Sequence, residues 1–321
     1  MDIPNFKAAI RDADSGSGEA RLVASIALGR VRDRNQPQAI EALGRLSRDP
    51  LEEVRAQALE GIAEQMRGEA HIPQTLIDQG LSDPSPRVRS VAVQNLILKG
   101  PGKAPLLIPM LEDPDPSVRA TICQILGDTG PEGAAFHLAR RLDDPVPFVT
   151  EEAALALAEL GDERGESILL KLLDRGHQQA IDAAYALGRI GKNTACSQLR
   201  QIVQKTFVST DLRAMAAAAL LSCGGADGRP VLEKLLKSRR SYTKHVVLCT
   251  LARLPVSNMA SSVAELLNHS KPDIISAAIE TLYILARLDK EEVIELLESK
   301  RTVLKGELGA ELGDRILLLR G

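Results

Sequence analysis

An aspartate followed six residues later by an arginine recurs along this chain, and the regularity of that frame restricts the fold more than any other feature. The arginine, or the residue that replaces it, falls at positions 21, 55, 89, 119, 150, 180, 213, 244 and 275, so the period is 30 to 34 residues. A period of roughly 20–50 residues indicates a solenoid or a propeller before any other architecture. The complete pairs are Asp49 and Arg55, Asp83 and Arg89, and Asp113 and Arg119.

Each repeat has the apolar spacing of helices. Ala183, Ala184 and Leu187 fall on one helical stripe, and residues 165–173 before them form a second amphipathic segment. The spacing predicts two antiparallel helices per repeat, and therefore an all-α chain folded as a right-handed α-solenoid of about nine stacked helix pairs. The predicted pairs are residues 4–31, 35–65, 70–98, 102–128, 131–159, 163–189, 193–222, 226–253 and 257–286. We expect a single solenoid over 1–321, with an N-terminal capping helix region at 1–17 and C-terminal capping helices at 287–321.

Recurring glycines, Asp-Pro pairs and small residues fit this architecture. Gly130 and Gly191 follow predicted helices, at a position where the backbone turns left-handed. Pairs such as Asp113-Pro114 end one helix and prepare the next, with Asp as a cap and Pro in the first turn. Small residues such as Gly127 let the two helices of a pair approach closely. Stacking brings the Asp and Arg of the frame into a ladder, in which we expect each arginine to reach two aspartates.

The full pattern is Asp-Pro-x-x-x-Val-Arg-x-x-Ala followed by Leu-Gly-x-x-Gly, and it is clearest in residues 113–130, DPDPSVRATICQILGDTG. It resembles the HEAT repeat, in the short form also found in phycobilisome-lyase-type proteins, over about residues 18–286. The resemblance implies the stacked-helix fold and says little about function, because one fold hosts many functions. Substitutions interrupt the frame at Thr150, Ala180, Phe207, Ser238 and His269.

Composition and charge argue against several classes of protein. The formal net charge of −3 gives no overall attraction to nucleic acid or to an anionic membrane. Residues 1–14 have no apolar signal core, and the longest apolar run, 214–221, is far shorter than the ~20 residues of a spanning helix. We therefore expect a soluble, cytoplasmic protein. Four cysteines without a Cys-x-x-Cys pair indicate reduced, buried thiols.

The sequence has no recognisable catalytic, metal or cofactor motif. Its histidines are scattered, without the His-Glu pairs of HEAT-like di-iron hydroxylases, and the absence of Trp argues against a HEAT-like DNA glycosylase. A P-loop, a nucleophile elbow and a dinucleotide fingerprint are all missing. Glu151 and Glu152 point about 100° apart on a helix and so do not form an acid–base pair. We expect no catalytic residues, no metal and no cofactor.

The second helix of each pair is expected to line the inner, concave surface, through positions two, five and nine after the anchor. Polar and acidic residues collect at these positions in the middle of the array, and we interpret them as a partner-binding patch. The predicted patch is Gln94, Gln124, Asp128, Glu152, Glu159, Asp182, Tyr185 and Arg189. An ordinary hydrated inner surface is the competing interpretation.

A basic segment follows the acidic one. Residues 189–245 hold 11 Lys and Arg against 3 Asp and Glu. The densest part is Lys234, Lys237, Arg239, Arg240 and Lys244. It suits a solvated helix end, a docking surface for an acidic protein, or nucleic acid. Tyr242 is the only aromatic residue in this stretch, which argues against base stacking.

These features favour a non-catalytic scaffold or adaptor that binds a partner, most simply another protein, along the concave face. A bilin lyase or chromophore chaperone is the first alternative, and it is the one that the form of the repeat resembles. Nucleic-acid binding through residues 234–244 is the second.

Overall fold

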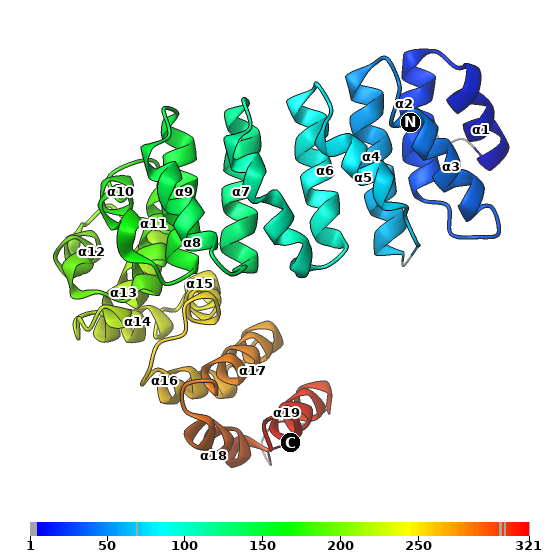
Figure 1. The fold of residues 1–321 in the computed structure, drawn as a ribbon. Helices are drawn as coiled ribbons and strands as arrows, with labels where there is room; N and C mark the ends of the chain where they lie inside the picture. Colours follow the sequence, from blue (N-terminus) through cyan, green and yellow to red (C-terminus); the bar gives the residue numbers. More distant parts are fainter. Residues whose placement is uncertain (1–4, 69, 302–303, 305, 321) are drawn as a thin grey trace. The chain divides into compact units, whose positions relative to one another are not determined.

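The computed structural model describes residues 5–68, 70–301, 304 and 306–320, and within these ranges every regular element is a helix. The predicted all-α class is confirmed. The chain forms two compact units, Met1–Ala156 (unit 1) and Leu157–Gly321 (unit 2) (Figure 1). Residues 1–4 of the predicted N-terminal cap, and residues 302–303, 305 and 321 of the predicted C-terminal cap, lie outside the described residues.

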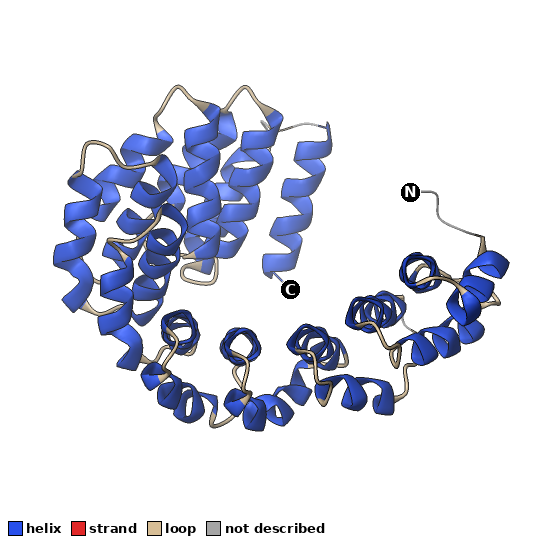
Figure 2. Cartoon of the chain, turned by 90° about the horizontal axis from the view of Figure 1, so that it is seen from above, coloured by secondary structure: helices blue, strands red, loops and turns tan. Residues whose placement is uncertain are grey.

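Unit 1 is a double row of helices. Its elements are α1 (Phe6–Ser15), α2 (Gly18–Gly29), α3 (Gln36–Leu46), α4 (Glu52–Arg67), α5 (Gln74–Leu81), α6 (Pro86–Leu98), η1 (Pro101–Glu112), α7 (Pro116–Thr129), α8 (Ala134–Arg140), η2 (Arg141–Asp143) and α9 (Pro147–Glu159), which continues into unit 2. Second helices pack on one another, α2 on α4, α4 on α6 and α6 on α7. Figure 2 shows these helices end-on in an inner row, with the first helices of the pairs outside them.

One first helix departs from the expected α conformation. Residues Pro101–Glu112 form a 3₁₀ helix with Pro105 and Pro109 inside it. Proline has no N–H to donate and its ring clashes with the carbonyl four residues earlier, so the α pattern of hydrogen bonds is blocked at both positions. The tighter 3₁₀ turn keeps this helix in its place against α7.

The small residues Gly29 and Gly127, eight residues after their anchors, pack against the next repeat rather than against the other helix of their own pair, which corrects the expectation from the sequence. A Cβ added at Gly29 would lie 2.8 Å from the Cα of Gly61, and one added at Gly127 would lie 2.7 Å from the Cα of Ala156. These contacts join α2 to α4 and α7 to α9, which are second helices of successive repeats. The glycines therefore set the spacing of the inner row.

Unit 2 continues the arrangement of paired helices. Its further elements are η3 (Glu163–Gly165), α10 (Glu166–Leu172), α11 (His177–Ile190), η4 (Asn193–Ala195), α12 (Cys196–Gln204), α13 (Thr210–Ser222), α14 (Gly228–Leu236), α15 (Ser241–Arg253), α16 (Ala260–Ala264), η5 (Glu265–Asn268), α17 (Pro272–Leu285), α18 (Lys290–Lys300) and α19 (Gly306–Arg320). Here α11 packs on α13, α13 on α15 and α15 on α17. The predicted left-handed glycines are confirmed, for example Gly191, whose φ of 70° ends α11.

Candidate functional site

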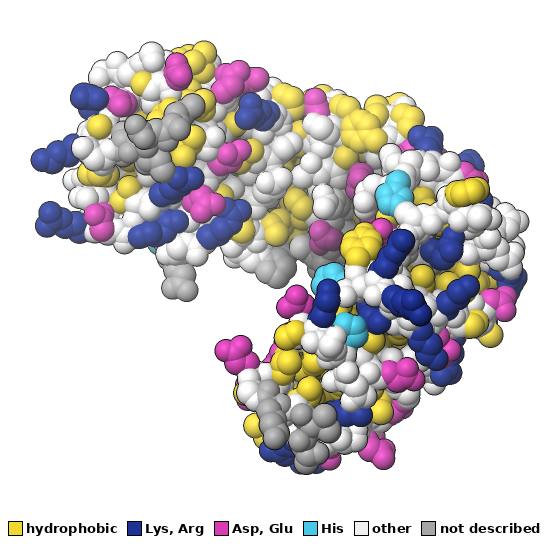
Figure 3. Space-filling model, turned by 180° about the vertical axis from the view of Figure 1, so that it is seen from behind, with side chains coloured by type: hydrophobic (Ala, Val, Ile, Leu, Met, Phe, Trp, Pro, Cys, Tyr) yellow, Lys and Arg dark blue, Asp and Glu magenta, His cyan; other side chains and the backbone are white. Residues whose placement is uncertain are grey.

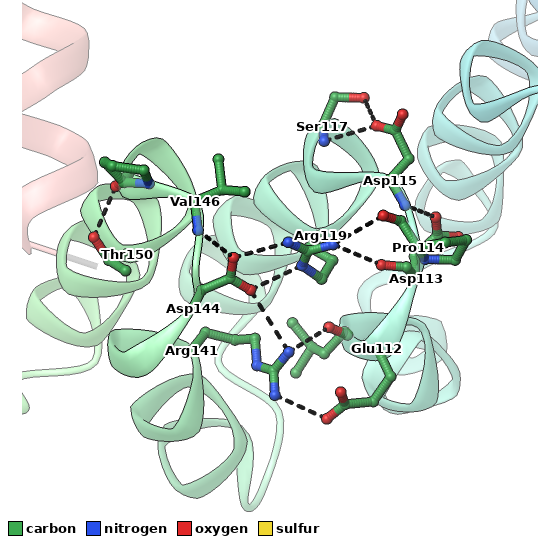
Figure 4. A network of polar contacts seen from close by, with 12 residues as sticks. Glu112, Asp113, Pro114, Asp115, Ser117, Arg119, Arg141, Asp144, Val146 and Thr150 are labelled. Atoms are coloured by element: carbon green, nitrogen blue, oxygen red, sulfur yellow. Dashed lines mark hydrogen bonds and ion pairs between the residues drawn. The ribbon is translucent and has the colours of Figure 1, made fainter.

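The Asp-Arg frame forms a ladder of buried ion pairs in unit 1. Arg119 donates from Nε and Nη2 to the two carboxylate oxygens of Asp144, each at 2.8 Å (Figure 4). The other rungs join Arg21 to Asp49, Arg55 to Asp83 and Arg89 to Asp113. Each arginine thus holds the aspartate of the next repeat with the planar fork that suits a carboxylate.

Each arginine reaches one carboxylate, not the two that the sequence suggested. Its remaining nitrogen, Nη1, donates to a backbone carbonyl of its own repeat, as from Arg119 to the carbonyl oxygen of Asp113 at 2.8 Å. Arg55 makes the same contact with the carbonyl of Asp49 at 2.9 Å. The side chain of this aspartate is already bound by the arginine of the preceding repeat. Only its main-chain carbonyl therefore contacts the arginine of its own repeat.

The ladder aspartates also cap the turns that follow them. Oδ1 of Asp144 accepts the N–H of Val146 at 3.0 Å, and the same contact two residues on is made by Asp49, Asp83 and Asp113. The proline beside the ladder aspartate does not lie in the first turn of the helix, as the sequence suggested. In α7 the helix begins at Pro116, and Pro114 lies before it. The hydrogen bonds from Arg119 hold the pKa of the Asp144 carboxyl below its ordinary value, although burial opposes them.

A cavity of about 560 Å³ lies against the inner row of unit 1, and we call it the unit 1 groove. Equivalent positions of α2, α4 and α6 line it, five and nine residues after each anchor. These residues are Ile26, Glu60, Gln94, Arg30, Glu64 and Leu98. The groove contains one residue of the predicted patch, Gln94. The next predicted residues, Gln124 and Asp128, are exposed on α7, and Glu152 is half-buried on α9.

In unit 2 the predicted patch residues form ion pairs with one another and with Arg253. Glu159 lies 3.5 Å from Arg189 and accepts a hydrogen bond from the Tyr185 hydroxyl at 3.3 Å. Asp182 pairs with Arg253 at 3.1 Å, and the Arg253 guanidinium stacks 4.2 Å from the centroid of Tyr185. These acids are therefore already neutralised by arginines of the same unit.

A second cavity, of about 530 Å³, adjoins this cluster, and we call it the unit 2 pocket. It brings together polar side chains of α11, α13 and α15 with an apolar wall that includes Met215. Its polar lining includes His177, Asp211, Tyr242, His245, Cys249 and Arg253. The Cys249 thiol lies 3.5 Å from Nε2 of His245, and burial raises its pKa. Nothing in the spacing of the histidines predicted this grouping.

The basic segment lies at the end of α14 and the start of α15. Lys234, Lys237, Arg239 and Arg240 are exposed, while the Lys244 ammonium donates to the carbonyl of Ser238 at 2.7 Å. Figure 3 shows Lys and Arg side chains gathered on this part of unit 2, beside histidines. Lys244 stands at an anchor position, so it repeats the carbonyl contact that ladder arginines make six residues back.

A family profile described as HEAT repeats matches residues 3–97, 73–158 and 104–184, which together span more than half of the 321 residues. This chain belongs to the HEAT-repeat family. The resemblance expected from the repeat frame is confirmed.

Solved structures similar to this HEAT-repeat protein share its fold at low sequence identity. The Escherichia coli protein YibA is 20% identical, with a TM-score of 0.56 over 68% of this chain and 82% of YibA. The complex of CpcE and CpcF of phycocyanin lyase from Nostoc sp. PCC7120 is 21% identical, with a TM-score of 0.50 over 78% of this chain and 96% of the other. A comparison with curated proteins found no match.

Three further features of the HEAT-repeat protein concern membranes, metals and its thiols. Over the described ranges, no helix combines the length and apolar character needed to cross a membrane, and no group of three or more His, Cys, Asp and Glu is placed to hold a metal ion. Cys123 and Cys223 are buried as expected, and burial raises the pKa of each thiol to about 12. Cys249 is exposed and Cys196 is half-buried, which corrects the expectation that all four thiols are buried.

Proposed function

We propose that this HEAT-repeat protein is a non-catalytic scaffold that binds a protein partner along the inner row of its second helices. The observation that carries the proposal is the unit 1 groove. Equivalent positions on three successive helices supply its walls, so the groove follows the repeat and is continuous along it. A continuous surface of this kind suits an elongated partner segment.

The chemistry of the groove supports binding rather than catalysis. Its lining mixes exposed apolar side chains such as Leu98 with carboxylates, amides and arginines, and it contains no histidine, cysteine or serine. Glu64 is paired with Arg67 at 2.5 Å, whereas Glu60 and Gln94 are exposed on neighbouring helices. Polar groups spaced by the repeat fix the register of a partner, and apolar groups between them provide buried area.

The test is quantitative affinity capture with a matched control. The variant Glu60→Arg with Gln94→Arg changes the groove, and Glu41→Arg with Gln38→Arg makes the same charge change on exposed positions of the outer helix α3. We expect partners recovered by the wild type to be lost from the groove variant and retained by the control. Equal recovery by all three proteins would exclude the groove as the binding surface.

A second candidate is binding of a linear tetrapyrrole in the unit 2 pocket. The pocket places His177, His245 and Arg253, which suit propionates, beside Tyr242 and Cys249, and its volume is within the range of about 300–1,000 Å³ for small-molecule sites. The phycocyanin lyase complex among similar folds is consistent with this candidate. Incubation with phycocyanobilin should shift the visible absorbance of the pigment, and Arg253→Ala should reduce the shift. An unchanged spectrum rejects the candidate.

A further inference from the structure

The unit 1 groove holds two charged side chains that nothing in the described part of the chain neutralises. Glu60 lies on α4 and Arg30 at the end of α2, and both are exposed. Neither side chain forms an ion pair or a hydrogen bond within the described ranges, whereas Glu64 and Arg67 pair with each other at 2.5 Å. A partner therefore meets one free carboxylate on the middle helix and one free guanidinium on the first.

Apolar side chains stand on both sides of Glu60 along the array. Ile26 occupies the equivalent position of α2 and is half-buried. On α6, Val91 is half-buried and Leu98 is 42% exposed. The three successive helices thus offer an apolar, an acidic and an apolar contact, in that order, within one cavity.

Two buried amides fix the spacing of these helices. Gln65 of α4 donates from Nε2 to the carbonyl of Leu28 in α2 at 2.7 Å. Asn95 of α6 donates from Nδ2 to the carbonyl of Leu59 in α4 at 2.8 Å, and both amide residues are at most 1% exposed. Breaking either link would leave buried polar groups unpaired, so the groove is preformed and needs no rearrangement to bind a partner.

The spacing matches one conformation of an extended peptide. Packed helices lie about 8–10 Å apart. A polyproline II segment rises about 3.1 Å per residue with three residues per turn, so every third side chain faces the same way at intervals of about 9 Å. Its backbone makes no internal hydrogen bonds, and the amide side chains of Gln57 and Gln94 in the groove supply donors and acceptors for it. Such a segment places one residue in three on each successive helix.

We propose that the unit 1 groove binds a polyproline II segment of a partner protein, in which apolar residues lie three places before and three places after a lysine or arginine. The basic side chain pairs with Glu60. The apolar side chains contact Ile26 at one end and Val91 with Leu98 at the other. An acidic residue beside the apolar one at the α2 end meets Arg30. This inference rests on the proposed scaffold function and names the class of segment that the scaffold binds.

The test measures the fluorescence anisotropy of a labelled peptide, Asp-Leu-Pro-Pro-Lys-Pro-Pro-Leu, with the full-length protein. We expect saturable binding that weakens as the salt concentration rises. Replacing both leucines by serine removes the apolar contacts and should weaken binding by about tenfold or more. Moving the lysine one place towards the first leucine, with the composition unchanged, turns its side chain away from Glu60 and should weaken binding by about fivefold or more.

Charge reversal tests the central contact. Glu60→Lys should weaken binding by about tenfold or more, whereas Glu41→Lys makes the same change on the exposed face of the outer helix α3 and should alter it by less than about twofold. Because both variants have the same net charge, a non-specific charge effect would alter both equally. A peptide with glutamate in place of lysine should bind Glu60→Lys more tightly than it binds the wild type.

Several results would overturn the inference. Equal affinity of wild type and Glu60→Lys would show that the basic residue does not contact Glu60. Equal binding of the peptide with the displaced lysine would show that the spacing of the helices is not recognised. If the peptide does not bind but Glu60→Arg with Gln94→Arg still loses native partners, the scaffold function stands and this class of segment is excluded. If the peptide does not bind and all variants recover the same partners, both are rejected.

Discussion

Arg119 and Asp144 are joined by two hydrogen bonds of 2.8 Å although they belong to different repeats. The side chain of Asp144 is 1% exposed and that of Arg119 is 9% exposed. Water therefore screens this pair very little, and its partners depend on each other. Arg141, at 3.7 Å, is the second cation near the carboxylate.

Removal of one partner should be costly. Arg119→Ala leaves the Asp144 carboxylate buried without its main donor, and we expect a loss of about 3 kcal/mol in the free energy of unfolding. Arg164→Ala is the control, because Arg164 pairs with Asp162 but its side chain is 45% exposed, and it should cost less than about 1 kcal/mol. Urea denaturation of both variants measures the difference. Equal losses would contradict a stabilising role for the ladder.

The same pair predicts a pH dependence. The folded state lowers the pKa of Asp144, so the stability it contributes is complete above the unfolded pKa of about 3.9 and is lost as pH falls through the lower folded value. The stability advantage of wild type over Asp144→Asn should therefore shrink below about pH 4. Denaturation curves at a series of pH values test this, and a constant difference down to pH 2 would be inconsistent with it.

The spacing of the inner helices depends on glycine at particular positions. Gly127→Ala gains helix propensity but places a Cβ 2.7 Å from the Cα of Ala156, so we expect a net loss of about 1–3 kcal/mol. Gly313→Ala in α19 meets no atom within 4 Å and should stabilise by up to about 1 kcal/mol. Thermal denaturation compares the two. The same sign for both substitutions would refute the packing explanation.

The thiols should differ in reactivity. Burial raises the pKa of Cys249 as well as those of Cys123 and Cys223, which reach about 12, but of these three only Cys249 is exposed. Iodoacetamide at mildly alkaline pH should therefore alkylate Cys249 well before these two, as peptide mass spectrometry can measure. Addition of urea should remove the difference, because all thiols become exposed. Rapid alkylation of Cys123 without denaturant would show that α7 opens readily.

The sequence predicts the architecture well because the signals are periodic. The period, the helical stripes and the glycines after helices each specify local geometry, and the structure agrees with them. The frame also indicated the ladder, but it could not show which aspartate each arginine selects. Spacing alone allows an arginine to bind the aspartate of its own repeat or that of the next repeat. The stacking of the repeats selects the aspartate of the next repeat.

The candidate binding surfaces were less predictable because they depend on contacts between distant residues. Arg253 and Asp182 are 71 residues apart, and they meet although α13 lies between their helices in the packing order. The residues of α13 from Ala216 to Ala219 are all buried, and such short side chains leave room for a contact across the helix. No local pattern marks this pair, or the meeting of His177 and His245 in one pocket.

The ladder makes the array modular. Each repeat carries an arginine for the repeat after it and an aspartate for the repeat before it, so a tandem copy of one whole repeat brings both halves of a rung. Duplication or deletion of a complete unit in this region leaves every carboxylate with a guanidinium. A partial copy or deletion that carries only the aspartate or only the arginine of a repeat instead leaves one buried charge without a partner, so the length of such a chain can change readily only by whole repeats.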